Sequence, residues 1–284
     1  EADDGRLLLT ITHDIAVARA IGGTVAVMRD GRIVEQGPAD TVLERPAHAF
    51  TRALIDAEPS RWPKRASTLR PDEPVIAAHG LTRRIGDRSL FEDLDIAIRP
   101  GEIVAVTGRS GSGKTMLGNI LLGLVTPDGG TVTRRAGARA HQFQKIYQDP
   151  PASFAPHEPL RRGLADLIAR HRLNPRKLDG LLERLAIDPS MLVRLPGEVS
   201  GGELQRLAIA RALMLDPVFL FADEATSRLD LLRQQEVMGL LVDLAAERGT
   251  GLLLVSHDPD LAATIADRRI DLDLLQQPDM THPA

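Results

Sequence analysis

The chain contains no cysteine among its 284 residues. This absence excludes disulfide bridges, thiolate zinc sites and cysteine-ligated iron–sulfur clusters, and it fits a reducing compartment. Aromatic residues are scarce as well, at 3% of the sequence, which argues against a platform on which nucleic-acid bases stack. A net charge of −4 gives no broad basic footprint, so no nucleic-acid partner is expected.

Long apolar runs are also missing. No run approaches the roughly 20 residues of a membrane-spanning helix, and no secretory signal is visible. The remaining composition, 43% hydrophobic and 26% charged, is that of an ordinary globular protein with enough apolar material for a core. The length favours two domains. The first residue is Glu1 rather than Met, which favours a fragment or a processed product.

One stretch, GRSGSGKT at residues 108–115, carries the clearest chemistry. It stands between an apolar run at 103–106 and a helix-like run at 116–124, the strand–loop–helix context of a phosphate-binding P-loop. Its glycines let backbone N–H groups close around phosphates, Lys114 can reach the β- and γ-phosphates, and Thr115 can hold Mg²⁺. A plain glycine-rich turn is the alternative. The candidate nucleotide-binding residues are Gly108, Ser110, Gly111, Ser112, Gly113, Lys114, Thr115 and Met116.

Two segments, residues 8–14 and 252–258, resemble each other at an offset of 244 residues. Each pattern predicts a buried strand, then His-Asp, then an amphipathic helix, with His13 and His257 in equivalent places. A repeat at this distance favours two tandem copies of one domain. Because only one P-loop is present, the simplest interpretation is that the first copy lacks its front portion.

The pattern along the chain predicts three parts. Residues 1–57 are the C-terminal remnant of the first copy, with a hairpin around Asp30-Gly31 and helices near 39–44 and 47–57. Residues 58–74 hold four prolines and four basic residues, and we expect a stiff, solvated linker, with a patch for lipid headgroups as the alternative. Residues 75–275 are a complete second copy, with a helical subdomain at about 150–203.

Within the second copy, strands alternate with helices, which indicates a mostly parallel sheet. We expect antiparallel strands around Gly86-Asp87, a turn at Gly129-Gly130, and helices broken near 174–175 and 188–189. Arg268-Arg269 are expected to be solvated or helix-terminal charges.

An apolar strand at 219–222 ends in two acids, Asp223 and Glu224. At a strand end beside a P-loop, Asp223 can orient Mg²⁺ and Glu224 can polarise the attacking water, because phosphoryl transfer needs metal and base next to the γ-phosphate. A helix N-cap is the alternative for such a pair. Upstream, Ser200-Gly201-Gly202 precede a predicted helix and make a second anion-binding nest.

In their order and spacing these motifs resemble the ABC ATPases. The set comprises the P-loop, Gln148 in IYQDP at 146–150, VSGGELQR at 199–206, FLFADEA at 219–225, SRLD at 227–230, and His257. The resemblance covers nearly the whole chain. It implies an α/β P-loop NTPase fold with a mostly parallel core sheet, an antiparallel β subdomain and an inserted helical subdomain.

The resemblance also implies roles. Two ATPase domains dimerise head to tail, and each ATP lies between one P-loop and the other domain's signature, where Ser200 and Gly202 contact the γ-phosphate. Gln148 senses Mg²⁺ and the attacking water, and Asp230 bridges the two domains. His257 holds the γ-phosphate; taken alone, it would be a strand-end histidine with a local hydrogen bond.

Two further stretches indicate a branch of the family. PAHAFTRAL at 46–54 and QDPPASFAP at 148–156 resemble segments of ATPases from oligopeptide, dipeptide and nickel importers, some of which are fused pairs. This implies an ATP-hydrolysing subunit at the cytoplasmic face of the inner membrane. Its partners would be integral permease subunits, a second ATPase domain and, indirectly, a solute-binding protein.

Other interpretations remain open on the sequence. A non-transport ABC ATPase of phosphonate metabolism, DNA repair or translation is the main rival, and an inactive interaction fragment is a third reading. Three departures from the family pattern are evident. Arg84 and Ile85 stand where an aromatic residue usually stacks on adenine, and Ala155 replaces a usual Asn. The second copy also lacks, after Asp271, the Asp-Gly hairpin and importer tail of the first copy. The sequence does not name a solute.

Overall fold

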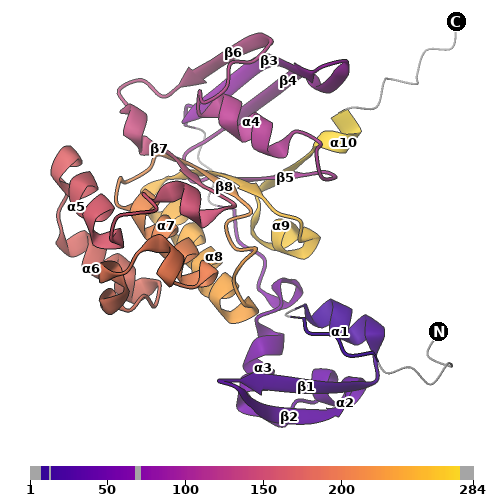
Figure 1. Ribbon diagram of the computed structural model, residues 1–284. Helices are drawn as coiled ribbons and strands as arrows, with labels where there is room; N and C mark the ends of the chain where they lie inside the picture. The colour runs from indigo at the N-terminus through magenta and orange to yellow at the C-terminus, as the bar shows by residue number, and fades with distance from the viewer. Residues whose placement is uncertain (1–7, 13, 68–71, 276–284) are drawn as a thin grey trace, which may run out of the picture. The chain divides into compact units, whose positions relative to one another are not determined.

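The computed structural model describes residues 8–12, 14–67 and 72–275, so the predicted His13 lies outside the described residues. The chain divides into two compact units. One contains the residues up to Trp62 together with Asp230–Gln235, and the other contains the rest of the chain from Pro63. Figure 1 shows the helices and strands of both units.

The first unit is a hairpin covered by short helices. Asp30 and Gly31 both have positive φ (49° and 75°), the backbone that a tight two-residue hairpin turn needs. Apolar side chains of α1, β1, α2 and α3 form a small core of Ile15, Val27, Ala39, Val42, Leu43 and Ile55. The predicted hairpin and helices are confirmed, with bounds α1 Ile15–Ile21, β1 Thr24–Arg29, β2 Arg32–Pro38, α2 Ala39–Glu44, α3 Ala49–Asp56 and η1 Pro59–Arg61.

The predicted buried strand at residues 8–12 is wrong. These residues form no strand, and Leu8, Leu9 and Ile11 are 75%, 83% and 95% exposed. The matching stretch in the second copy lies between two neighbouring strands and is fully buried. A strand is stabilised by its neighbours' hydrogen bonds and packing, and the apolar pattern alone does not supply them.

The second unit is built on a five-stranded parallel sheet in the order β10-β5-β9-β8-β7. The bounds are β5 Ile103–Thr107, β7 Phe143–Ile146, β8 Phe219–Asp223, β9 Gly251–Val255 and β10 Arg268–Asp271. Nearly all residues of β5, β8 and β9 are buried, as expected for strands covered on both faces. Because the strands are parallel, their last residues, Thr107, Ile146, Asp223 and Val255, lie at the same edge of the sheet.

A three-stranded antiparallel sheet, β4-β3-β6, forms the predicted β subdomain, with β3 Ile76–Ile85, β4 Arg88–Ile98 and β6 Gly129–Arg134. The predicted turn at Gly129-Gly130 is wrong, because both residues begin β6. Gly130 has φ 85°, and a Cβ there would lie 2.5 Å from the carbonyl oxygens of His79 and Gly80. Close approach of two backbones, rather than a turn, requires this glycine.

The helices from α4 onward agree with the predicted breaks, and the first residues of α8 belong to the first unit. Their bounds are α4 Lys114–Leu121, α5 Leu160–His171, α6 Arg176–Arg184, α7 Gly201–Leu213, α8 Leu231–Arg248, α9 Pro259–Ile265 and α10 Leu272–Leu275, with 3₁₀ turns η2 Ala140–Gln142, η3 Pro150–Ser153, η4 Pro189–Val193 and η5 Pro196–Glu198. Among the described residues, no helix combines the length and apolar character needed to cross a bilayer.

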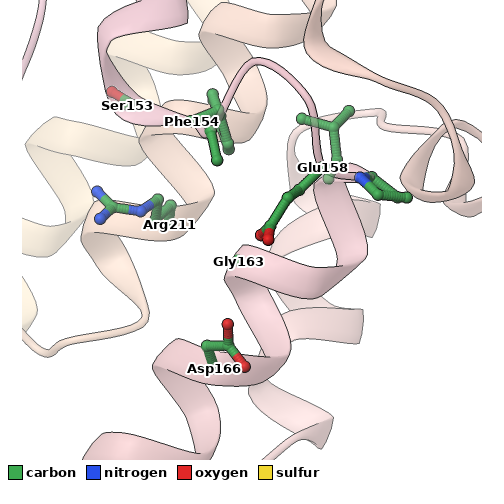
Figure 2. A pocket seen from close by; sticks show the side chains of 9 residues that line it. Ser153, Phe154, Glu158, Gly163, Asp166 and Arg211 are labelled. Atoms are coloured by element: carbon green, nitrogen blue, oxygen red, sulfur yellow. The ribbon is translucent and has the colours of Figure 1, made fainter.

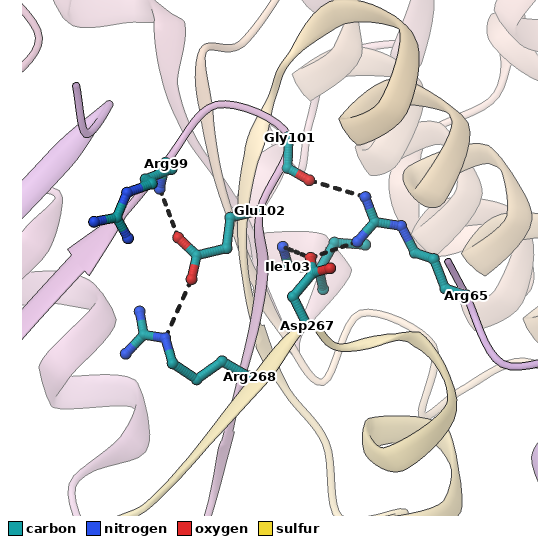
Figure 3. Close-up of polar contacts among 7 residues, drawn as sticks. All are labelled: Arg65, Arg99, Gly101, Glu102, Ile103, Asp267 and Arg268. Atoms are coloured by element: carbon teal, nitrogen blue, oxygen red, sulfur yellow. Dashed lines mark hydrogen bonds and ion pairs between the residues drawn. The ribbon is translucent and has the colours of Figure 1, made fainter. Parts of the chain in front are cut away.

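Part of the expected solvated linker is instead fixed to the sheet (Figure 3). The Arg65 side chain is 8% exposed and donates to Asp267 Oδ2 at 2.5 Å and to the Gly101 carbonyl at 2.9 Å. Asp267 Oδ2 also accepts from the Ile103 N–H at 2.8 Å. The buried Asp267 carboxylate needs a cationic partner, and Arg65 of the proline-rich stretch provides it.

Arg268 and Arg269 are exposed, as expected, but Arg268 also has fixed partners at the amino edge of the sheet. Its Nε lies 3.1 Å from Glu102 Oε1 (Figure 3). Its Nη2 donates to the Ala97 carbonyl at 2.6 Å. Glu102 is only 2% exposed, and its second oxygen accepts from the Arg99 N–H at 2.7 Å. Strand β10, which the sequence analysis did not predict, carries Arg268 to this position.

Gly118 on α4 faces the ring of Phe221 on β8, and a Cβ there would lie 2.2 Å from two ring carbons. We predict that Gly118→Ala lowers the free energy of unfolding by about 1–3 kcal/mol, because an overpacked core outweighs the gain in helix propensity. Gly163→Ala on α5 is the matched control, since no heavy atom lies within 4 Å of its built Cβ. Urea unfolding of both variants tests this, and equal midpoints would contradict it.

Candidate functional site

The loop between β5 and α4 has the backbone of a phosphate nest. Gly108, Gly111 and Gly113 have φ of 138°, 78° and 104°, which residues with a side chain rarely adopt. A Cβ on Gly108 would also lie 2.7 Å from Ser112 Oγ. The strand–loop–helix arrangement expected for residues 108–115 is therefore present, with loop N–H groups and the N-terminus of α4 available to an anion.

Lys114 lies over this loop. Its side chain is buried, and Nζ donates to the carbonyls of Gly108 at 2.7 Å and Arg109 at 2.8 Å. Two loop carbonyls thus fix the ammonium beside the nest. An ammonium group at this position can contact phosphates that are bound by the loop N–H groups.

Thr115 and Asp223 meet at the carboxyl edge of the sheet. Thr115 Oγ1 donates to Asp223 Oδ1 at 3.1 Å, and Asp223 is 3% exposed. A hydroxyl and a carboxylate are the hard oxygen ligands that Mg²⁺ takes when substrate phosphates complete its shell. Within the described part of the chain, no group of three or more His, Asp or Glu side chains forms a metal cage of its own. These two residues fit a Mg²⁺ that is shared with a nucleotide.

Lys145 is a site residue that the sequence analysis missed. It lies on β7, and its Nζ is 3.0 Å from Asp223 Oδ2 and 3.0 Å from Asn119 Oδ1. Residues 141–147 are polar as well as apolar, so no local signal in the sequence singles out this lysine.

Glu224 lies between Gln148 and His257, two of the three other predicted catalytic residues; the third is Lys114. Gln148 Nε2 donates to Glu224 Oε2 at 2.6 Å, and His257 Nε2 lies 2.7 Å from Glu224 Oε1. The Glu224 side chain is 15% exposed and its backbone has φ 50°, a strained conformation for a residue with a side chain. The structure therefore brings together Glu224, Gln148 and His257, which are far apart in the sequence. A carboxylate oriented in this way can accept a proton from water.

The predicted signature residues open α7. Ser200 is the N-cap, its Oγ accepts from the Glu203 N–H at 3.3 Å, and both its N–H and its hydroxyl donate to Glu203 Oε2, at 2.9 and 2.7 Å. The side-chain hydrogen bond from Ser200, and then its backbone N–H, hold the pKa of Glu203 below its usual value of 4.5. Ser200 and Gly201 are exposed, and Gly202 is half-buried. Among the described residues, no hydrogen bond joins Ser200 to Lys114.

Asp230 is exposed and accepts from the Arg233 N–H at 3.0 Å, at the start of α8. This helix-capping contact accounts for an acid at this position within one chain. Its predicted role as a bridge between two domains stays a prediction.

A pocket of about 250 Å³ lies between η3, α5 and α7 (Figure 2). Its lining includes Phe154, Glu158, Asp166 and Arg211, and burial lowers the pKa of the Arg211 guanidinium. None of the predicted nucleotide-binding or catalytic residues lines it. The candidate phosphate and metal residues Lys114, Thr115 and Asp223 therefore lie outside this pocket.

Comparison with known proteins agrees with this geometry. The family described as ABC transporter matches residues 91–227, which include the P-loop, Gln148, the signature and the acidic pair.

Two relatives are similar to this chain over nearly its whole length. The Peptidoglycan transport ATP-binding protein YejF of Agrobacterium fabrum is 35% identical over 294 residues, which cover 93% of this chain and 53% of that protein. The Glutathione import ATP-binding protein GsiA of Escherichia coli is 32% identical over 312 residues, covering 92% of this chain and 50% of that protein. The chain thus spans about half the length of these relatives.

Solved structures share the fold. The ATP-binding cassette MJ0796, in a dimeric post-hydrolysis state bound to ADP and Pi, matches with a TM-score of 0.61 and 25% identity, covering 69% of this chain and 93% of that one. A second structure, described as the dimeric structure of this bacterial ABC transporter cassette, gives a TM-score of 0.60 at the same identity and coverage. The predicted fold class is confirmed.

The capping box of α7 gives a pH-dependent prediction. Because the pKa of Glu203 is lowered on folding, its contribution is present above pH 4.5 and is lost as the pH falls through the folded pKa. We expect Glu203→Ala to lower the free energy of unfolding by about 1 kcal/mol at pH 7 and by less below pH 4. Denaturant titration at both pH values measures this, with the exposed Glu247 on α8 mutated to Ala as the control; a loss that does not change with pH would contradict it.

Proposed function

The chain carries a domain of the ABC transporter family, and we propose that it is the ATP-binding and ATP-hydrolysing subunit of an importer for peptides, nickel or a similar small solute. The observation that carries the proposal is the placement of Glu224 between Gln148 and His257, directly after the Asp223 that meets Thr115. Binding residues and a candidate base thus share one sheet edge.

In this proposal the nucleotide phosphates occupy the loop at residues 108–115, where Lys114 and the loop N–H groups offset their charge. Thr115 and Asp223 would hold the Mg²⁺, and Gln148 would be the third residue directed toward it. When bound, the metal would stabilise the negative charge of the phosphates. Glu224 orients the attacking water and takes its proton. Gln148 and His257 hold the Glu224 carboxylate in place, and the exposed face of His257 is available to the γ-phosphate.

We propose that the active form is a head-to-tail pair, because the predicted γ-phosphate contacts Ser200 and Gly202 are not joined to Lys114 within one chain. Exposure of Ser200 and Gly201 supports this, since a partner's phosphates can reach them. The related cassette MJ0796 is described as dimeric, with ADP and Pi bound. Asp230 would then bridge the two domains.

The names of the relatives favour an importer over a non-transport ATPase, since they are described as peptidoglycan transport and glutathione import proteins. On this basis the partners are integral permease subunits and, through them, a solute-binding protein. The chain would work as a peripheral protein at the cytoplasmic face of the inner membrane. No nucleic-acid partner is proposed.

We also propose the domain boundaries that the repeat suggests. Residues 1–57 would close a first ATPase copy, 58–74 would link it, and 75–275 would form the second copy with a helical subdomain near 150–203. The exposed apolar residues of 8–12 support this, because the equivalent strand β9 is buried between two neighbours. Residues 8–12 would then be a strand in the parallel sheet of that first ATPase copy.

Two substitutions separate binding from hydrolysis. Lys114→Ala removes the cation at the β- and γ-phosphates and should abolish tight ATP binding. Glu224→Gln keeps the shape of the site and loses the base, so it should bind ATP but hydrolyse it about 10²–10⁴-fold more slowly. Equilibrium binding of ATP and phosphate release measure the two effects. Hydrolysis at the wild-type rate by Glu224→Gln would exclude Glu224 as the base.

The paired site predicts complementation between two inactive variants. Lys114→Ala and Ser200→Arg should each be inactive, but a mixed pair has one intact site, made of Lys114 from one copy and Ser200 from the other. An equal mixture should recover about a quarter of the wild-type activity, because half of the pairs are mixed. Steady-state hydrolysis by the mixture and by each variant alone checks this. A mixture no more active than its components would contradict pairing.

A further inference from the structure

Lys145 is a buried cation at the proposed metal site whose role the fold alone does not explain. Its side chain is 8% exposed, and that of its ion-pair partner Asp223 is 5% exposed. The ammonium also lies over the rings of Tyr147 and Phe221, at 5.0 and 4.9 Å from their centroids. A lysine enclosed by a carboxylate, an amide oxygen and two aromatic faces keeps its charge at a fixed place.

The two oxygens of Asp223 face different partners. Oδ1 accepts from the Thr115 hydroxyl and Oδ2 meets the Lys145 ammonium. The carboxylate proposed as a metal ligand is thus already neutralised from within the protein. In a buried site this matters, because charges there interact more strongly than they do in water.

We propose that Lys145 is a positioning residue that supplies a built-in positive charge to the Mg²⁺ site. This inference rests on the proposed function. The fixed charge has two consequences. It offsets the phosphate charge when no metal is present, so that ATP binds without Mg²⁺. It also repels an incoming divalent cation, so that the site binds the metal more weakly than a bare Asp–Thr pair would.

The test replaces Lys145 by Met, which keeps the length of the side chain and removes the charge. Binding of radiolabelled ATP is measured by equilibrium dialysis with EDTA and with Mg²⁺, and Mn²⁺ binding to the ATP complex is followed by electron paramagnetic resonance. With EDTA present, we expect Lys145→Met to bind ATP about tenfold more weakly than the wild type does. In the separate titration without EDTA, we expect the ATP complex of Lys145→Met to bind Mn²⁺ about tenfold more tightly than the wild-type complex does.

Lys177→Met is the matched control, because Lys177 is a partly buried lysine that pairs with Asp216 and the Met214 carbonyl away from this site. It should change neither affinity. Lys145→Arg keeps the charge and should retain metal-free binding. If Lys145→Met changes neither affinity, Lys145 is only a structural counter-ion and the inference is overturned.

The wild-type protein provides a test that needs no variant. Its ATP binding should persist with EDTA, within about tenfold of the value with Mg²⁺. Complete loss of ATP binding with EDTA would overturn the inference even if Lys145→Met failed to fold. Failure of the wild type to bind ATP with Mg²⁺ would instead overturn the proposed function, so the two failures are distinguishable.

Discussion

The site depends on one buried carboxylate, that of Asp223, at the end of β8. Its oxygens meet Thr115 from α4 and Lys145 from β7, so one side chain ties together the P-loop helix and two strands of the parallel sheet. The contact with Thr115 is possible because Gly118 lets α4 pack directly on Phe221. Helix placement, sheet order and the charges of the site are therefore parts of one constraint.

The acidic residues at the two edges of the parallel sheet have different kinds of partners. At the amino edge, Glu102 and Asp267 are paired with Arg268 and Arg65, whose guanidinium groups do not give up their protons (Figure 3). At the carboxyl edge, Glu224 is held by a neutral amide from Gln148 and by His257. The first arrangement fixes the sheet permanently. The second leaves the Glu224 carboxylate oriented but able to accept a proton, which a base must do.

The sequence predicted the elements whose signals are local. The P-loop, the hairpin at Asp30-Gly31 and the proline-marked breaks of the helices follow from turn chemistry and periodicity over a few residues. The role of Arg65 was missed because its partner Asp267 lies 202 residues away, and Lys145 was missed because its partner lies on another strand. The strand predicted at residues 8–12 was wrong for the same physical reason. These residues have the apolar pattern of β9, but they do not lie between two strands as β9 does. The gathering of Gln148, Glu224 and His257 was inferred from resemblance, because spacing alone does not bring three strand ends together.

The signature shows how a structural motif and a binding motif use the same atoms. In the isolated chain the Ser200 hydroxyl donates to Glu203 and closes the capping box of α7. If Ser200 turned to a phosphate of a partner, it would give up this hydrogen bond, and Glu203 would lose the contact that lowers its pKa. The N-terminus of α7 would still offer free N–H groups and a favourable dipole to the anion. The free energy of pairing must therefore exceed the cost of opening the capping box, about 1 kcal/mol. Nucleotide binding would then couple the order at the start of α7 to the assembly of the second chain, so that the signature helix is fully engaged only when the pair is formed.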